Sequence, residues 1–323
     1  MNQDLLKIEH LSVSFKNSKD QTHAVRDLSL TVKGGEVVGL VGESGSGKSV
    51  TARSIVGLLS NSKKTAVSGR VLFKGQNLLM NQERKRLNSQ KIAMIFQDPL
   101  NSLNPVYTIG HQIREVFMVR KKMGKAIANA RAIDILKKVD IQSPETIARQ
   151  YPHQLSGGMC QRVMIAIALA AEPELLIADE PTTALDVTIQ AQILKLLYQL
   201  YTTTKTAILF ITHDLGLVAQ FCHFVAIMQE GQIVEKGRVS DIFKNPQHPY
   251  TKGLINSIPV LGKKKRLNPM PLYQGGVHPN SSCSFFPRCT EIKRRCEKET
   301  PEFIEIEPGH FVRCHIEDGV SLL

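Results

Sequence analysis

The sequence predicts an α/β fold with four parts: a parallel-sheet core, an antiparallel β subdomain, a helical subdomain and a small C-terminal extension. Three observations predict it. Short apolar runs alternate with stretches of helical periodicity, as parallel strands do when helices connect them. These runs stop between residues 98 and 154, where apolar residues recur at helical spacing instead. Beyond about residue 257, Pro, Lys, Gly and Cys replace any regular period.

The first strands are expected in a small antiparallel sheet. Apolar residues alternate with other types at 6–10 and again at 28–32, and a polar loop separates the two runs. A period of two is typical of strands that bury one face. Residues 36–41 are instead mostly apolar, and they lead into a glycine-rich loop and a helical stretch over 48–59. This change marks the start of an α/β unit.

Four more apolar runs of strand length predict the remaining core strands. They lie at residues 92–96, 175–178, 207–211 and 224–228. The clearest helix of the insertion covers 124–139, and prolines lie at the ends of the insertion. We expect one main domain at 1–257, which contains the helical subdomain at about 98–157, and then the extension at 258–323.

Composition and charge indicate where the chain is expected to be located, but they do not identify its ligand. The 323 residues include 41 Lys and Arg against 29 Asp and Glu, which gives a formal charge of +12. This balance suits nucleic acid, an anionic membrane surface or a phosphorylated ligand. The first seven residues lack the apolar core of a secretion signal. The apolar run at 163–171 is far shorter than the roughly 18 residues that cross a bilayer. We therefore expect a cytosolic chain.

A phosphate-binding loop is predicted directly after the apolar run at 36–41. Residues 42–49 read GESGSGKS, which fits G-x-x-x-x-G-K-[ST] between a strand and a helix. Glycines let successive backbone N–H groups point at phosphate oxygens, and the helix start adds the positive end of its dipole. Lys48 is expected to reach the outer phosphates and Ser49 to bind Mg²⁺. The candidate nucleotide contacts are Gly42, Glu43, Ser44, Gly45, Ser46, Gly47, Lys48, Ser49 and Val50.

Two acids end the apolar run at 175–178. In a protein with such a phosphate loop, an Asp at a strand end holds Mg²⁺, directly or through water, and a neighbouring group positions the attacking water. Asp179 would neutralise metal charge, whereas Glu180 would accept a proton from the water aimed at the γ-phosphate. Without the loop at 42–49, two acids before Pro181 would indicate only a turn.

Residues 155–159 read LSGGM and are followed by Gln-Arg, which resembles the signature motif of ABC ATPases. Met159 stands where that motif usually has Gln, a substitution that is familiar in the peptide-transporter branch of the family. The motif begins a predicted helix, so a hydroxyl, N–H groups and the helix dipole meet there. In the family this site binds the γ-phosphate of ATP held by the other subunit, which implies catalysis in a dimer. The implied contacts are Ser156, Gly157 and Gly158.

Four other positions of this family are also filled. Gln97 resembles the Q-loop glutamine, residues 184–186 (ALD) resemble the D-loop with Asp186, and His213 resembles the switch histidine. Phe15 stands where an aromatic ring stacks on adenine. Taken singly, each residue also fits a structural role. These roles are a cap for Gln97, a helix N-cap for Asp186, a core residue for Phe15 and a strand-end histidine for His213.

Over about residues 5–257, the resemblance implies an ABC ATPase. This is a P-loop NTPase with a RecA-like parallel-sheet core that binds ATP and Mg²⁺. The implied catalytic residues are Lys48, Glu180 and His213, and the implied Mg²⁺ ligands are Ser49, Gln97 and Asp179.

The end of the chain resembles one branch of the family. The tract NPQHPYT at 245–251 and the tract DEPTTALDVTIQAQ at 179–192 are similar to those of dipeptide and oligopeptide import ATPases. The spacing C-x5-C-x6-C-x17-C resembles the extension in which dipeptide-importer ATPases hold a [4Fe-4S] cluster. Zinc and unligated thiols remain alternatives, although zinc sites usually have closer cysteine pairs. The candidate ligands are Cys283, Cys289, Cys296 and Cys314.

The resemblance implies an ATPase that drives di- or oligopeptide import from the cytoplasmic face of the bacterial inner membrane. The implied partners are a second ATPase subunit, commonly a paralogue, two permease subunits and an extracytoplasmic substrate-binding protein. A nickel importer and a soluble ABC ATPase acting on nucleic acid are alternatives. The single cassette and the absence of sustained heptads weigh against the second alternative, so we expect no nucleic acid partner. The sequence does not name the cargo, because in this scheme the cargo does not contact this subunit.

Overall fold

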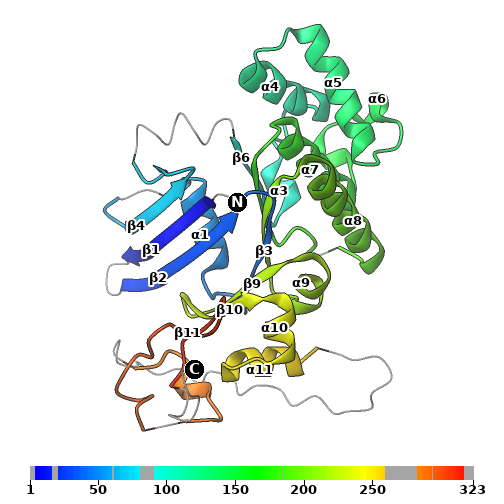
Figure 1. Cartoon of the computed structure of the whole chain (residues 1–323). Helices are drawn as coiled ribbons and strands as arrows, with labels where there is room; N and C mark the ends of the chain where they lie inside the picture. Colours follow the sequence, from blue (N-terminus) through cyan, green and yellow to red (C-terminus); the bar gives the residue numbers. More distant parts are fainter. Residues whose placement is uncertain are drawn as a thin grey trace.

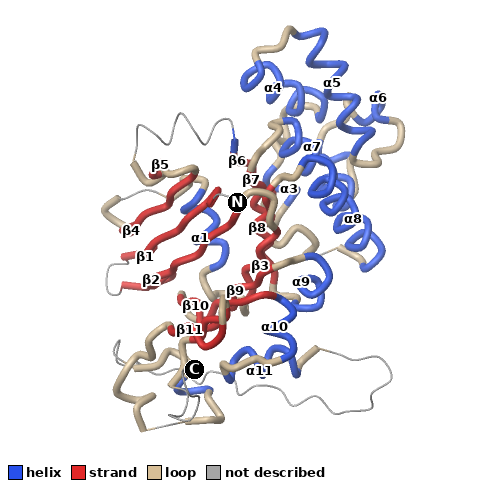
Figure 2. Tube along the Cα trace, in the orientation of Figure 1, coloured by secondary structure: helices blue, strands red, loops and turns tan. Residues whose placement is uncertain are grey.

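Figure 1 shows the computed structural model of the chain, which describes residues 4–16, 21–59, 62–80, 91–183, 185–258, 282–292 and 294–315. Two sheets organise it, as the red segments of Figure 2 show. One sheet has four strands in the order β2-β1-β4-β5, and the other has eight in the order β11-β12-β10-β9-β3-β8-β7-β6. Ala184, the first residue of the predicted D-loop, lies outside the described ranges.

The four-stranded sheet is antiparallel throughout, as the alternating pattern at 6–10 and 28–32 predicts. Leu6 and Ile8 pair with Val32 and Leu30, and all four side chains are buried. The sheet is larger than the two predicted runs because β1 pairs with a strand on each side. Its members are β1 (Asp4–Lys16), β2 (Gln21–Lys33), β4 (Thr65–Phe73) and β5 (Gln76–Asn77).

The eight-stranded sheet contains the predicted parallel core. Every predicted core run forms a strand here, and each of these strands is parallel to its neighbours in the core. The carboxyl ends of parallel strands lie at one edge of a sheet, which brings together loops that are far apart in sequence. The core strands are β3 (Val37–Val41), β6 (Ile92–Ile95), β7 (Leu175–Asp179), β8 (Ala207–Thr212) and β9 (Phe224–Gln229).

Helix α1 (Lys48–Ile55) lies between the two sheets (Figure 1). Its residues Ala52 and Ile55 pack among buried residues of both sheets. It ends earlier than the predicted 48–59, because Gly57 has φ +79° and stops the helix. Three helices cover the other face of the large sheet. They are α7 (Gly157–Ala170), α8 (Val187–Thr204) and α9 (Leu215–Phe221).

The strand-free insertion is helical, as predicted, and extends away from the four-stranded sheet (Figure 1). Phe117 and Leu136 of this insertion join the same buried cluster as Ile165 of α7, so the insertion is packed on the core helices. No helix of the described ranges is long and apolar enough to cross a membrane. The insertion contains α3 (Pro99–Ser102), α4 (Ile109–Lys121), α5 (Lys125–Lys138), α6 (Pro144–Ile147) and η1 (Pro152–Gln154).

The C-terminal residues extend the large sheet, which their lack of periodicity did not predict. Strand β10 (Gln232–Arg238) pairs with β9 on one side and β12 (His310–Val312) on the other, both antiparallel. The added strands cover the hydrogen-bonding edge that β10 would otherwise expose. The other elements of this region are α10 (Val239–Lys244), α11 (Pro249–Asn256), η2 (Phe286–Arg288) and β11 (Ile304–Glu307).

A buried carboxylate connects these C-terminal elements. Glu235 of β10 is fully buried, and its oxygens accept the N–H groups of Gln247 (2.8 Å) and His248 (2.9 Å). Its Oε1 also lies 2.8 Å from Nε2 of His310 on β12. Burial alone would raise the pKa of Glu235, but the hydrogen bonds outweigh burial and hold this pKa below its ordinary value. One carboxylate therefore ties together β10, the start of α11 and β12.

The protonation state of His248 is expected to control the stability of this region. Its ring is almost fully buried, and Nδ1 accepts the N–H of Tyr250 as the N-cap of α11 (3.0 Å). Burial lowers the pKa of His248 from 6.5 to about 4. Between these values the unfolded chain binds more protons than the folded chain, so stability falls as the pH falls. The shift corresponds to about 3 kcal/mol of unfolding free energy.

Denaturant unfolding between pH 7 and pH 4.5 measures this effect. The variant His248→Asn keeps an oxygen that can cap α11 and removes the titrating ring. We expect the unfolding free energy of the wild type to fall more steeply with decreasing pH than that of the variant. Equal slopes for the two proteins would contradict the role of His248.

Candidate active site

The loop at residues 42–49 runs from the end of β3 to the start of α1, with no room for side chains at two of its glycines. A Cβ on Gly42 would lie 2.1 Å from the carbonyl oxygen of Met228, and one on Gly47 would lie 2.3 Å from that of Ala24. Gly47 is also the N-cap of α1 with φ +102°, a conformation that L side chains rarely adopt. The loop backbone therefore lies directly against the end of β9 and against β2.

Lys48 and Ser46 provide the polar groups inside this loop. Lys48 Nζ is buried and donates to the carbonyl oxygens of Gly42 (2.8 Å) and Glu43 (2.9 Å), and burial lowers its pKa. The Ser46 hydroxyl is buried without a hydrogen-bond partner in the described part of the chain. A loop with a buried ammonium and an unsatisfied hydroxyl suits an anion with several oxygen atoms, such as a phosphate chain.

Ser49 and Asp179 meet beside the loop. The Ser49 hydroxyl donates to Asp179 Oδ1 (3.0 Å), and Asp179 is 2% exposed at the end of β7. Burial raises the pKa of Asp179, an effect that a bound cation would oppose. A hydroxyl and a carboxylate are oxygen ligands of the type that Mg²⁺ prefers. The residues present therefore fit this ion.

Glu180, the residue after β7, has an unusual backbone conformation. Its φ is +46°, in the left-handed region, and its N–H donates to the carbonyl oxygen of Ile211 at the end of β8 (2.9 Å). Such strain persists in a non-glycine residue only where surrounding contacts fix it, and it is common at active sites. The strained turn separates the directions of two adjacent carboxylates, so that Asp179 faces Ser49 while Glu180 faces other partners.

Three predicted residues converge on the Glu180 carboxylate. Oε2 accepts from Gln97 Nε2 (3.0 Å) and lies 3.4 Å from Nδ1 of His213, and Oε1 lies 4.0 Å from Lys48 Nζ. The hydroxyl of Thr183 also donates to Oε2 (2.9 Å). Gln97 thus contacts the candidate base, and its role as a Mg²⁺ ligand beside Ser49 and Asp179 stays a prediction. Asp98, and not Gln97, caps α3.

The other predicted nucleotide contacts lie outside this cluster. Ser156 caps α7 by accepting the N–H of Met159 (3.3 Å), and Asp186 caps α8 by accepting that of Ile189 (2.9 Å). Both caps are exposed, so their helix ends face solvent. Phe15 is partly buried against the core of the four-stranded sheet. In the single chain, Asp186 is therefore a helix N-cap and Phe15 packs against the core, which are the structural roles considered for these two residues.

The C-terminal cysteines do not form a metal site as they are placed here. The N–H of Cys283 donates to the carbonyl oxygen of Cys296 (2.9 Å). Burial, together with the neighbouring thiols of Cys296 and Cys289, raises the pKa of Cys283. Within the described ranges, no three or more His, Cys, Asp or Glu side chains are arranged to hold a metal ion. This geometry supports neither the predicted [4Fe-4S] cluster nor the zinc alternative.

Three further contacts of the site have no recognisable local signal in the sequence. Thr183 binds the candidate base, and Tyr250 and Arg288 bind Glu43 in the phosphate loop. Tyr250 and Arg288 belong to tracts that indicate the peptide-transporter branch, but nothing in either tract indicates a partner some two hundred residues earlier.

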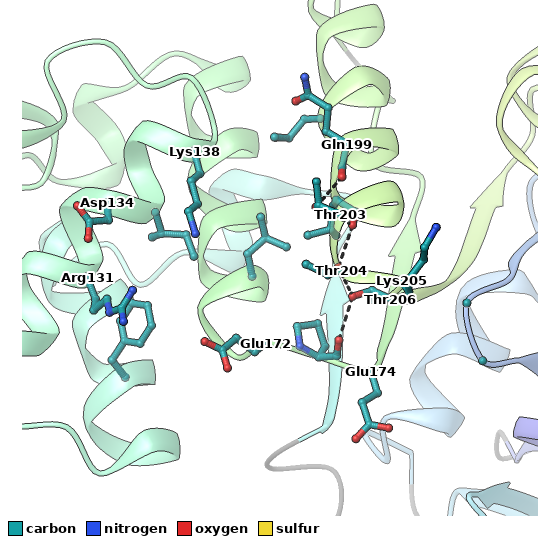
Figure 3. A pocket seen from close by; sticks show the side chains of 18 of the residues that line it. Arg131, Asp134, Lys138, Glu172, Glu174, Gln199, Thr203, Thr204, Lys205 and Thr206 are labelled. Atoms are coloured by element: carbon teal, nitrogen blue, oxygen red, sulfur yellow. Dashed lines mark hydrogen bonds between the residues drawn. The ribbon is translucent and has the colours of Figure 1, made fainter.

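A separate cavity of about 860 Å³ lies between the helical insertion and the core (Figure 3). Arg131, Asp134 and Lys138 of α5 line one side of it, and Gln199 and Thr203 of α8 line the other. Its remaining wall includes residues that precede β3, β7 and β8, at the sheet edge opposite the catalytic groups. None of the predicted site residues lines this cavity.

A phosphate loop between a strand and a helix, with adjacent Asp and Glu carboxylates at the end of another strand of the same sheet, defines the class of P-loop ATPases. The family described as "ABC transporter" matches residues 25–183, and "Oligopeptide/dipeptide transporter, C-terminal region" matches residues 234–296. The chain belongs to the ABC transporter family of ATP-binding proteins, in its oligopeptide and dipeptide branch.

Individual relatives agree over nearly the whole chain. The dipeptide transport ATP-binding protein DppD of Escherichia coli (strain K12) is 46% identical, covering 96% of each chain. The oligopeptide transport ATP-binding protein AppD of Bacillus subtilis (strain 168) is 44% identical, covering 98% of each. A solved dimeric ATP-binding cassette with ADP and Pi is 27% identical, with a TM-score of 0.65 over 72% of this chain and 98% of that one. These likenesses confirm the predicted fold class.

Proposed function

We propose that this chain hydrolyses ATP to energise import of dipeptides or oligopeptides, bound peripherally at the cytoplasmic face of a bacterial inner membrane. One observation carries the proposal: Lys48, Ser49, Asp179 and Glu180 converge on a phosphate loop. They do so in a chain similar over nearly its full length to dipeptide and oligopeptide transport ATP-binding proteins. The domain limits proposed for this activity are 1–257 for the ATPase, with the helical subdomain at about 98–157, and 258–323 for the extension.

ATP would bind with its phosphates in the loop at 42–49. Backbone N–H groups and the start of α1 would face the phosphate oxygens, and the Ser46 hydroxyl would gain an acceptor. Lys48 now donates to two loop carbonyl oxygens, and it would donate to the outer phosphates instead. Ser49 and Asp179 would hold Mg²⁺, which neutralises phosphate charge when bound. Phe15 would stack on the adenine ring.

Glu180 would act as the general base. Its carboxylate would accept a proton from water as the water oxygen bonds to the γ-phosphorus and the bond from phosphorus to the β,γ-bridging oxygen breaks. Gln97 and Thr183 donate to Oε2 and orient the carboxylate. Nδ1 of His213 lies close to the same oxygen, so its ring would lie beside the γ-phosphate of bound ATP. Lys48 Nζ lies 4.0 Å from Oε1 of the same carboxylate.

We further propose that the exposed start of α7 completes the site of a second ATPase subunit. Ser156 and Gly157 are exposed, Gly158 is partly exposed, and α7 is 14 residues long, so its N-terminal dipole faces solvent. Asp186 is exposed too. In the closed pair these groups would bind the γ-phosphate of the partner's ATP. We expect the partner to be a paralogue.

A groove beside Gln97 is the proposed contact with the permease. It encloses about 280 Å³ between β6 and the helical insertion, and its walls include Phe96, Leu103 and Met164. Leu100 and Val106 are 53% and 71% exposed in the same insertion. An apolar groove with exposed apolar side chains nearby suits an amphipathic segment of a membrane subunit. We propose two such permease subunits and an extracytoplasmic substrate-binding protein as the remaining partners.

For the C-terminal cysteines we propose, from the sequence resemblance, a [4Fe-4S] cluster, with zinc as the alternative. Four thiolates are the right number for the cluster, although no three or more of the described His, Cys, Asp and Glu side chains are arranged to hold a metal ion. Anaerobic purification with iron, sulfide and zinc analysis tests this. Stoichiometric iron and sulfide would support the cluster, stoichiometric zinc would replace it, and a metal-free protein would contradict both.

Reconstitution tests the transport function. The membrane proteins that co-purify with the chain are placed in proteoliposomes with their binding protein, and ATP-dependent uptake of labelled dipeptides is measured. We expect ATP-dependent uptake of dipeptides with the wild type and no uptake with the Glu180→Gln variant. ATP-dependent uptake of Ni²⁺ but not of peptides would favour the nickel alternative. Steeply salt-dependent binding of DNA or RNA, without any membrane partner, would favour the nucleic acid alternative.

A further inference from the structure

Two C-terminal residues bind the same residue of the phosphate loop. The guanidinium of Arg288 donates to both carboxylate oxygens of Glu43, with Nη1 2.6 Å from Oε2 and Nη2 2.8 Å from Oε1. The hydroxyl of Tyr250 accepts the backbone N–H of Glu43 (2.9 Å). Tyr250 lies on α11 and Arg288 on η2. The start of the loop is therefore fixed through both its backbone and its side chain.

Aromatic packing holds Arg288 in this position. Its guanidinium lies 5.7 Å from the ring centre of Phe285, and its side chain is only 10% exposed. Phe285 is itself 3% exposed and packs against Tyr250 and His248, with ring centres 5.4 and 5.5 Å apart. Forked, partly buried Arg–carboxylate pairs are stronger and more directional than exposed ones. The pairing with Glu43 is thus a built contact and not a chance surface ion pair.

The charge of Glu43 explains why such a contact matters. A carboxylate in a phosphate loop opposes the approach of a triphosphate. The hydrogen bonds from Arg288 lower the pKa of Glu43 and so keep this carboxylate ionised. Its compensating charge comes from the far end of the chain, 245 residues away. Lys48, the nearest loop cation, donates to the backbone carbonyl oxygen of Glu43.

We propose that Arg288 is a positioning residue for ATP binding, which fixes the phosphate loop through Glu43 and neutralises the Glu43 charge beside the triphosphate. The inference rests on the ATP site proposed above. It makes the C-terminal extension a part of the nucleotide site of its own chain. A preorganised loop loses less conformational freedom when the phosphates bind.

A double-mutant cycle on the full chain tests the proposal. The dissociation constant of ATP is measured by calorimetry for the wild type, Arg288→Ala, Glu43→Gln and the double variant. Arg288→Ala is expected to weaken ATP binding about tenfold, a typical size for coupling between sites. The double variant is expected to recover most of that loss, because no uncompensated carboxylate remains. In turnover assays, KM for ATP is expected to rise in Arg288→Ala while kcat changes less than about twofold.

Lys252→Ala is the matched control, because Lys252 joins α11 to Glu291 of the extension (3.1 Å) without contacting the loop. Its ATP affinity is expected to equal that of the wild type. If Arg288→Ala folds poorly, Arg288→Lys keeps the charge without the fork and should bind ATP with intermediate affinity. Unchanged affinity in Arg288→Ala, or no recovery in the double variant, would overturn the proposal. A wild type that fails to bind ATP would instead refute the ATP site itself.

Discussion

Replacing Glu180 with Gln is expected to lower ATP turnover by about three orders of magnitude, within the range that general base catalysis contributes. The amide keeps the size of the side chain and can accept hydrogen bonds from Gln97 and Thr183, but it cannot take a proton from water. In the proposed site ATP binds through the loop and Lys48, so its dissociation constant should stay within about threefold of the wild type. Calorimetry and a phosphate-release assay measure the two quantities separately.

Glu174→Gln is the control for this experiment. Glu174 forms ion pairs with Lys74 and Lys91 just before β7, at the opposite end of the strand from Glu180. Its replacement removes one carboxylate next to the same strand without touching the site, and turnover should remain unchanged. If Glu180→Gln hydrolysed ATP at the wild-type rate, Glu180 would not be the base.

The sequence predicts best what is local in the chain. The loop at 42–49 and the acids at 179–180 each depend on a short strand and the residues directly after it, so motif and apolar pattern agree. Strand β4 was not predicted, because its buried residues cluster at one end while four of its nine residues are exposed. It is a strand because β1 needs a second partner, which only the tertiary fold supplies.

Long-range contacts define the limits of the prediction. Glu43 and Arg288 are 245 residues apart, and β10 and β12 join across a gap of some seventy residues. No period or motif encodes such pairs. Gln97 shows the same limit within the site: the sequence identified the residue but did not indicate its hydrogen bond to Glu180. The roles expected for Ser156 and Asp186 depend on a second subunit, so one folded chain shows only their action as helix caps.

Gly47→Ala is expected to weaken ATP binding by at least about a hundredfold. Its new Cβ would lie 2.3 Å from the carbonyl oxygen of Ala24 and 2.7 Å from Cε of Met228, and φ is +102°. Backbone cannot yield as a flexible side chain can, so the loop must move by about an ångström, and misplacement on that scale costs about two orders of magnitude at a preorganised site. Calorimetric titration with ATP measures the loss, and circular dichroism checks that the fold is kept.

Gly45→Ala separates this steric effect from backbone strain. Gly45 also has a positive φ, +81°, but a Cβ there meets nothing within 4 Å. The left-handed conformation alone costs about 1–2 kcal/mol in a residue with a side chain, so binding should weaken no more than about thirtyfold. Similar losses in the two variants would mean that strain, and not the contact with Ala24, restricts the loop. A larger loss for Gly47→Ala would mean that phosphate binding requires the loop to lie against β2.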